Sequence, residues 1–431
     1  MAEDKPKKQF KLFTYPNGLR LVTVPMENTK SVMVLILVAT GSRYETPKNN
    51  GISHFLEHLM FKGTDKRPGT LDISYELDSI GADYNAFTSK EYTGYYVKCA
   101  SDKINTALDV ISDIFQNSKF DAQEMDKERG PIKEEINMYF DTPARRVTEL
   151  FDELIYGDHP LGWNVAGKKE IIDAMRRDDI VEYFNTHYFA KSTLVCIAGN
   201  ITPEMAEEKV ANYLNNIREA EVIKPIPALE GQSEPRLKIF NKKTDQTHIN
   251  FGFRAYSRFH PKLEALEAMS FILGSGMSSR LFVEVRQKLG LAYRVGSGAT
   301  SYNETGDLST FAGLNNDNLL DALKVILREH KKLVQEPVSE QELQRTKDYA
   351  KGRLAIGLET SDAYASFYGE QELLENRMLT PEERLEKVMA VTREDIQEVA
   401  KDILKPGKLN LAIVGPFKED NHEIKDILNS W

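Results

Sequence analysis

The 431-residue sequence has little of several residue types, and each shortage narrows what the protein can be. It holds two cysteines, Cys99 and Cys196, too few for a disulfide framework, and their apolar neighbours fit buried thiols. A formal net charge of −10 argues against a nucleic-acid partner, which requires a basic footprint. The longest apolar run, residues 32–39, suits a buried strand and is too short to span a bilayer. Residues 1–8 lack the apolar core of a secretion signal, so we expect a cytoplasmic protein with no membrane partner.

Histidine is also scarce, yet two of the eight histidines lie four residues apart in the segment His54-Phe55-Leu56-Glu57-His58. On a helix, residues four apart share a face, with Cβ atoms about 5–6 Å apart. Two imidazoles at that spacing can bind one Zn²⁺, and Glu57 can reach a metal-bound water. The H-x-x-E-H order is the inverse of the common zinc-protease motif and is highly specific. The alternative is a surface helix with two incidental histidines.

A catalytic zinc usually has three protein ligands and one open position, so a third ligand is expected elsewhere in the chain. The best candidates lie in an acidic stretch with a helical pattern, residues 121–141. Glu128 and Glu135 are seven residues apart there, which places them on one helix face, two turns from each other. On spacing alone, either carboxylate can bind the metal while the other orients a ligand or the water.

With the paired histidines followed by these glutamates, the sequence resembles the pitrilysin/insulinase/mitochondrial-processing-peptidase family of zinc endopeptidases, as a short member. The resemblance implies that His54, His58 and Glu135 hold one zinc ion per chain. It also implies that Glu57 is the general base and that Glu128 is an acid in the outer coordination sphere. The alternative for Glu128 is an ordinary solvated helix residue.

Two further segments resemble parts of this family that bind substrate. Residues 85–89 resemble its substrate-binding edge strand, which implies that an extended peptide pairs with Asn85, Ala86, Phe87 and Thr88. Arg286 and Tyr293 match its arginine–tyrosine pair, which holds substrate and stabilises the oxyanion. The alternatives are an ordinary edge strand and a pair of packing residues.

The chain has the pattern of an internal duplication. Residues 80–84 can be laid over residues 289–293, and residues 120–125 over residues 338–343. Between them, residues 218–235 show little periodicity and several prolines, which indicates a linker. We therefore expect a zinc-binding catalytic domain at 1–217 and a homologous metal-free domain, carrying the arginine–tyrosine pair, at 236–431.

The alignment of the two halves removes every candidate metal ligand from the second half. Aligning Gly63 with Gly274 puts Ala265 opposite the first histidine, Ala268 opposite the glutamate of the motif and Met269 opposite the second histidine. The second half is therefore expected to keep the fold without the metal chemistry.

The order of elements indicates the fold class. We expect paired strands at 19–24 and 32–38, the metal helix at 51–61 and a second helix at 71–80. Two more strands at 83–87 and 92–98 precede a helix at 103–115. Strands and helices in this order favour an α+β fold of two homologous α/β-sandwich domains, each a mostly antiparallel sheet with helices packed on one face.

These expectations describe a zinc metalloendopeptidase for unstructured peptides or presequences, active in processing or in peptide degradation. Long members of the family enclose substrate between two duplicated halves, and this chain supplies one. The resemblance thus implies a homodimer in which Arg286 and Tyr293 act in trans on the partner's zinc site. Two alternatives remain open, the catalytic subunit of an obligate heterodimer and a non-catalytic structural relative.

Overall fold

The computed structural model describes residues 9–214 and 216–431, which form two compact units. Unit 1 comprises the described residues up to Ile136, together with Asn164–Ile226 and Ala355–Pro381. Unit 2 comprises Asn137–Trp163, Pro227–Leu354 and Glu382–Trp431. Residues 217–233 contain no helix or strand, and the units divide at residue 226, inside the predicted linker. Neither unit is continuous in sequence, because each includes a segment from the other side of that linker.

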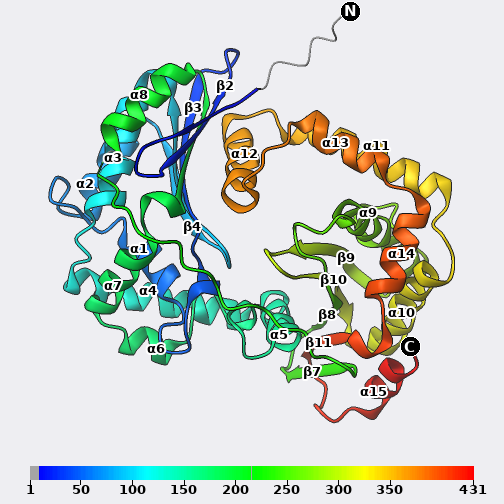
Figure 1. Cartoon of the computed structure of the whole chain (residues 1–431). Helices are drawn as coiled ribbons and strands as arrows, with labels where there is room; N and C mark the ends of the chain where they lie inside the picture. The colour runs from blue at the N-terminus through cyan, green and yellow to red at the C-terminus, as the bar shows by residue number, and fades with distance from the viewer. Residues whose placement is uncertain (1–8, 215) are drawn as a thin grey trace, which may run out of the picture. The chain divides into compact units, whose positions relative to one another are not determined.

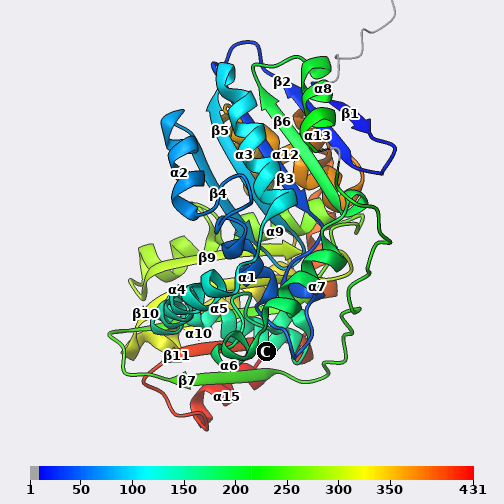
Figure 2. The same ribbon diagram turned by 90° about the vertical axis from the view of Figure 1, so that its left-hand side faces the viewer.

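Unit 1 is built on a six-stranded, mostly antiparallel sheet, seen face-on in Figure 2. Its strands, in spatial order, are β1 (Lys11–Thr14), β2 (Arg20–Pro25), β6 (Thr193–Gly199), β3 (Ser31–Val38), β5 (Thr93–Ala100) and β4 (Asp83–Thr88). β2 and β6 form the parallel pair, and β4 lies at one edge. The expected pairing of the first two long strands is wrong, because β6 lies between β2 and β3 and bonds to both. Alternating hydrophobicity identifies a strand, but a distant segment decides its neighbour.

The sheet of unit 1 is covered on both faces. Along β3, Val32, Val34 and Ile36 point into one core, whereas Met33 and Leu35 point into another. The first core packs under α1 (Ile52–Leu59), α3 (Ile104–Asn117) and α8 (Pro203–Tyr213). The second packs under α12 (Ser361–Glu375), which Figure 1 shows on the opposite side of the sheet from α3 and α8. The expectation of helices on one face is therefore wrong, because α12 comes from the second half of the sequence and covers the other face.

Unit 2 repeats the arrangement. Its five strands, in spatial order, are β7 (Arg236–Asn241), β11 (Asn410–Gly415), β8 (Gln246–Ala255), β10 (Gly306–Asn315) and β9 (Ala292–Ser301). This is the order of unit 1 without β1, with one parallel pair, β7 and β11. The main core lies under α9 (Leu263–Gly274), α10 (Leu319–Gln335) and α14 (Arg393–Ile403). α5 (Pro143–Tyr156), from the first half of the sequence, packs on the other face through Val147, Leu150 and Phe151.

The predicted fold class is confirmed: the chain is α+β, with two sandwiches of the same strand order. The predicted helices at 51–61, 71–80 and 103–115 are also found. The remaining helices are α2 (Thr70–Ser79), α4 (Ala122–Asp141), α6 (Lys169–Ala174), α7 (Arg177–His187), α11 (Glu340–Gly357), α13 (Pro381–Ala390) and α15 (His422–Asn429). None of the helices in the described part of the chain has the length and hydropathy that crossing a membrane requires.

Candidate metal centre

The short helix α1 carries the H-x-x-E-H motif and depends on its surroundings to stay helical. Its eight residues are too few for a helix that is stable alone, which needs about 12–15 residues. Ile52, Phe55, Leu56 and Leu59 are fully buried, and burying each such side chain contributes about 1.5–3 kcal/mol. The apolar face fixes the helix against the sheet and leaves the other face for the polar residues of the motif.

A buried carboxylate holds the first turn of this helix. Glu45 accepts hydrogen bonds from the backbone N–H groups of Gly51 (2.8 Å) and Ser53 (2.9 Å) and from Nδ2 of Asn50 (2.9 Å). Burial raises the pKa of Glu45, and these donors oppose that rise. The N-terminal N–H groups of a helix favour negative charge, so Glu45 serves as the cap that Gly51 cannot provide. The sequence analysis assigned no role to this glutamate.

Three predicted ligands meet in unit 1. Nε2 of His54 lies 3.3 Å from Nε2 of His58, and Oε2 of Glu135 lies 3.4 Å from the first and 3.7 Å from the second. Tetrahedral zinc with bonds of 2.0–2.2 Å separates its ligand atoms by about 3.4 Å. The triangle therefore fits one zinc ion without rearrangement. Within the described residues, no other group of three His, Cys, Asp or Glu side chains is arranged to hold a metal.

Glu128 orients the second histidine. Its Oε1 lies 2.9 Å from Nδ1 of His58, and its Oε2 lies 2.6 Å from Nζ of Lys62. A proton on Nδ1, donated to this carboxylate, leaves Nε2 free to face the other ligand atoms, as outer carboxylates do in metal sites. The structure places Glu128 beside His58, and its support of a metal ligand stays a prediction. Lys62 was missed, although it lies one turn beyond His58, because lysine is no ligand at neutral pH.

The carboxylates around His58 favour its protonated form. Burial alone would lower the pKa of His58, but the carboxylates of Glu128, Glu135 and Glu57 outweigh it and raise the pKa to about 9. Burial likewise opposes ionisation of Glu128, but hydrogen bonds from His58 and Lys62 lower its pKa. A bound metal must displace the proton that His58 would carry, so metal binding and proton release are linked here.

Glu57, the predicted general base, is held from the edge strand. Its Oε2 accepts a hydrogen bond of 2.6 Å from Oγ1 of Thr88, the last residue of β4. Asn85, Ala86 and Phe87 precede Thr88 on this strand, which pairs with β5 on one side and lies at the edge of the sheet on the other. The predicted substrate strand is thus an edge strand that contacts the motif directly. The side-chain bond between Thr88 and Glu57 was not predicted.

The predicted arginine–tyrosine pair lies in unit 2, and its members contact each other. The guanidinium of Arg286 lies 5.3 Å from the ring centre of Tyr293 and 4.9 Å from that of Phe282. Arg286 belongs to a π-helix, η5 (Phe282–Lys288), a form found often at functional sites. Tyr293 is 75% exposed at the start of β9, so its hydroxyl is accessible to a substrate.

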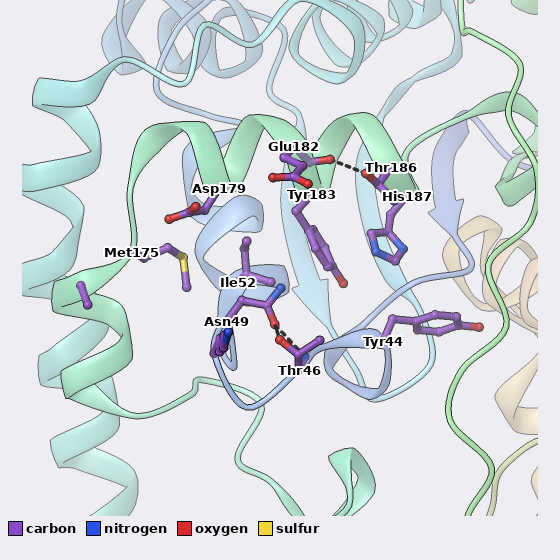
Figure 3. Close-up of a pocket in the computed structure, with 12 residues that line it drawn as sticks. Tyr44, Thr46, Asn49, Ile52, Met175, Asp179, Glu182, Tyr183, Thr186 and His187 are labelled. Carbon is purple, nitrogen blue, oxygen red and sulfur yellow. Dashed lines mark hydrogen bonds between the residues drawn. The ribbon is translucent and has the colours of Figure 1, made fainter.

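A cavity of about 560 Å³ lies beside the first turn of α1. Figure 3 shows Tyr183 and His187 of α7 pointing toward it, together with Ile52 of α1. The hydroxyl of Tyr183 lies 2.9 Å from Oγ of Ser53 and 3.2 Å from Oγ1 of Thr40. Burial lowers the pKa of His187 to about 4, so this histidine is neutral at pH 7. The wall of the cavity therefore braces the residue that precedes the first histidine of the motif.

Comparison with known proteins identifies the family. Residues 20–169 match the family described as insulinase (peptidase family M16), and residues 174–349 match its inactive domain. The uncharacterized zinc protease YmxG of Bacillus subtilis (strain 168) is 34% identical over 406 residues, covering 94% of this chain and 98% of its own. The chain belongs to the M16 peptidase family. An uncharacterized zinc protease of Rickettsia bellii is 33% identical to this M16 chain, covering 95% of it and 98% of its own length.

Solved structures have the same fold. A protease from Helicobacter pylori aligns with a TM-score of 0.89 at 23% identity, over 94% of this chain and 99% of its own. A chain of Complex III2 from Candida albicans aligns with a TM-score of 0.84 at 19% identity, over 97% of this chain and 99% of its own. The family and the names of its bacterial relatives support a zinc protease, with zinc as its cofactor.

Proposed function

We propose that this chain is a zinc-dependent endopeptidase that cleaves unstructured peptides, with one zinc ion per chain held by His54, His58 and Glu135. The observation that carries the proposal is the triangle of ligand atoms, whose edges of 3.3, 3.4 and 3.7 Å suit a single tetrahedral ion. The Glu128 carboxylate beside Nδ1 of His58 adds the outer partner that metal-binding histidines usually have.

The residues around the triangle supply the rest of the chemistry. When bound, zinc would polarise the scissile carbonyl and lower the pKa of a water to about 7. Glu57 takes the proton of the attacking water and then delivers it to the leaving nitrogen. Glu128 keeps the imidazole of His58 turned toward the metal. A base of this kind typically contributes about 10²–10⁴ to the rate.

The edge strand β4 supports unstructured peptides as the substrate class. An extended peptide adds to Asn85–Thr88 as a further strand, bonded through main-chain groups that every sequence offers. Cleavage is therefore loose in sequence preference and strict for unfolded segments, because the strands of a folded sheet have no free edge. Presequences and degradation products share this property.

A homodimer would complete the site. Arg286 anchors a substrate carbonyl and Tyr293 donates a hydrogen bond to the oxyanion, each acting in trans on the zinc site of the partner chain. The exposure of Tyr293 and its contact with Arg286 support a paired role. The test mixes a Glu57→Gln chain with a Tyr293→Phe chain, both inactive alone. Activity returns in the mixed dimer if the arrangement is in trans, and its absence after verified mixing contradicts it.

The main experiment digests unstructured peptides of graded length with and without a chelator, read by mass spectrometry. We expect internal cleavage that stops with the chelator and returns with zinc. Glu57→Gln should lower kcat by about 10²–10⁴ while the chain keeps its zinc. Glu134→Gln, which changes the exposed neighbour of Glu135, is the matched control and should keep activity. Digestion that ignores the chelator would contradict zinc-dependent cleavage, whereas no digestion by the zinc-loaded protein would favour a non-catalytic relative. Activity that appears only with a second protein would favour the obligate heterodimer. The cytoplasmic location is a separate expectation and stays a prediction.

A further inference from the structure

Thr88 stands at the junction of the edge strand and the metal helix. Its hydroxyl donates a 2.6 Å hydrogen bond to Oε2 of Glu57, the one hydrogen bond to this carboxylate seen among the described residues. A hydroxyl bonded to a carboxylate at this length is in the short, charge-assisted range. The other oxygen of Glu57, Oε1, stays available to take a proton.

The pleat of β4 separates two tasks. Tyr84 and Ala86 pack against the core that lies under α1, and Thr88 shares their face because side chains alternate along a strand. Phe87 packs against the opposite core. The backbone of β4 is thus available at the sheet edge, whereas the Thr88 side chain turns toward Glu57. One strand offers its main chain to a peptide and its side chain to the base.

Unit 2 shows which residue takes this position where no base is present. The strands β6 and β11 both end in a glycine, Gly199 and Gly415. From the residues before these glycines, the pairings lead through Met33 and Lys98 to Asp83 in β4, and through His248 and Gly313 to Arg294 in β9. Five residues further along each strand, Ala299 is the counterpart of Thr88. The helix of unit 2 likewise has Ala268 where unit 1 has the glutamate of the motif. The hydroxyl and the carboxylate are therefore present together in unit 1 and absent together in unit 2.

We propose that Thr88 is a positioning residue, whose hydroxyl fixes the Glu57 carboxylate relative to the strand edge where the peptide docks. The proposal deepens the proposed function and rests on it. Proton transfer needs the base within a fraction of an ångström of its place, and a misplacement of about 1 Å can cost about 10²-fold in rate. By tying the base to the substrate strand, Thr88 makes the two move together. The resemblance assigned this residue to substrate binding, a role that would affect KM instead.

The experiment compares Thr88→Val with Thr88→Ser in the zinc-loaded full-length protein, on one fluorogenic peptide that the unaltered protein cleaves. Valine keeps the shape of threonine without the hydroxyl, and serine keeps the hydroxyl. We expect Thr88→Val to lower kcat by about 10–100-fold with KM within about twofold, and Thr88→Ser to restore most of kcat. Zinc content should stay unchanged in both. A crystal structure of Thr88→Val should show the Glu57 carboxylate displaced.

Thr93→Val is the matched control. Thr93 lies opposite Thr88 in the register of the sheet and donates to the backbone carbonyl of Thr40 at 2.9 Å, so its loss removes a comparable hydrogen bond away from the base. It should lower the unfolding temperature without changing kcat. Three results would each overturn the positioning role while leaving the zinc peptidase intact. They are an unchanged kcat in Thr88→Val, a rise in KM alone, and a kcat that serine does not restore. An unaltered protein without zinc-dependent cleavage would overturn both.

Discussion

The first helix of each sandwich, α1 in unit 1 and α9 in unit 2, packs on an equivalent sheet. The two helices differ in the residues that they carry at the positions of the motif. Helix α1 begins at Ile52 and α9 at Leu263, and the same count from these starts puts Ala265, Ala268 and Met269 in the positions of the motif. All three are buried in unit 2, where most residues of α9 are buried. The sandwich therefore folds with packing residues in these positions. The architecture therefore does not require the histidines and glutamate of unit 1, which is consistent with the proposed chemical role.

The same contrast extends to the long helices. Helix α4 begins at Ala122 and α11 at Glu340, so Thr346 corresponds to Glu128 and Arg353 to Glu135. Thr346 is buried and donates its hydroxyl to a backbone carbonyl one turn earlier. Where the ligand is absent, its outer partner is absent too. Unit 2 therefore lacks the whole set of residues that we propose to bind and orient the metal.

The largest effect is expected when unit 1 is given the unit 2 residue at a ligand position. Loss of a residue that only orients a ligand typically lowers metal affinity by about 10–100-fold. His58→Met should lower zinc affinity by more than this and abolish cleavage, because it removes one of the three ligand atoms. The fold should persist, since methionine packs at the equivalent position of unit 2. Zinc is measured by mass spectrometry and folding by circular dichroism. His422→Gln, at an exposed histidine, is the control, and normal zinc content in His58→Met would contradict the assignment.

A smaller effect is expected at the outer partner. Glu128→Thr copies unit 2 and removes the carboxylate beside Nδ1 of His58, so the imidazole loses its fixed orientation. Zinc affinity should fall by about 10–100-fold, with partial activity at saturating zinc. Competition with a chromophoric chelator measures it. Glu124→Gln, one turn earlier on α4 and paired with the exposed Lys127, should leave the affinity unchanged. Equal affinities in both variants would mean that His58 is held by packing alone.

The close approach of His54 and His58 was predictable from sequence, because a four-residue spacing on one helix fixes geometry locally. The choice of Glu135 over its neighbours came from the family resemblance, since two glutamates seven apart are equivalent on spacing alone. Thr88 was found for its place on the strand, yet its bond to Glu57 depends on how the strand and helix pack. Lys62 and Glu45 act through other residues, and no local pattern reveals such a role.

Long-range arrangement was the part of the fold that could not be predicted. Apolar and β-branched residues identified β2 and β3, but β6, far along the chain, inserts between them. The exchange of α5 and α12 between the two halves was also missed. The sequence of each helix shows which residues can be buried, but it does not show which sheet the helix covers. The uniformly apolar β3 did carry a signal, because a strand buried on both faces requires a second layer.

The smallest effect is the difference between one buried histidine of each unit in how it makes stability depend on pH. Burial lowers the pKa of His330 in unit 2 and of His187 in unit 1 to about 4, below the ordinary value of 6.5. Because the unfolded chain then binds protons more readily, stability is complete above about pH 6.5 and falls as the pH approaches 4, by up to about 3 kcal/mol for each histidine. His330 is enclosed by the core, whereas His187 borders a cavity that water can enter. His330→Gln should therefore flatten the fall in urea-unfolding free energy between about pH 7 and 4.5 more than His187→Gln does. A reversed ranking would mean that the cavity beside α1 is closed to water and that the metal helix is as tightly packed as its counterpart.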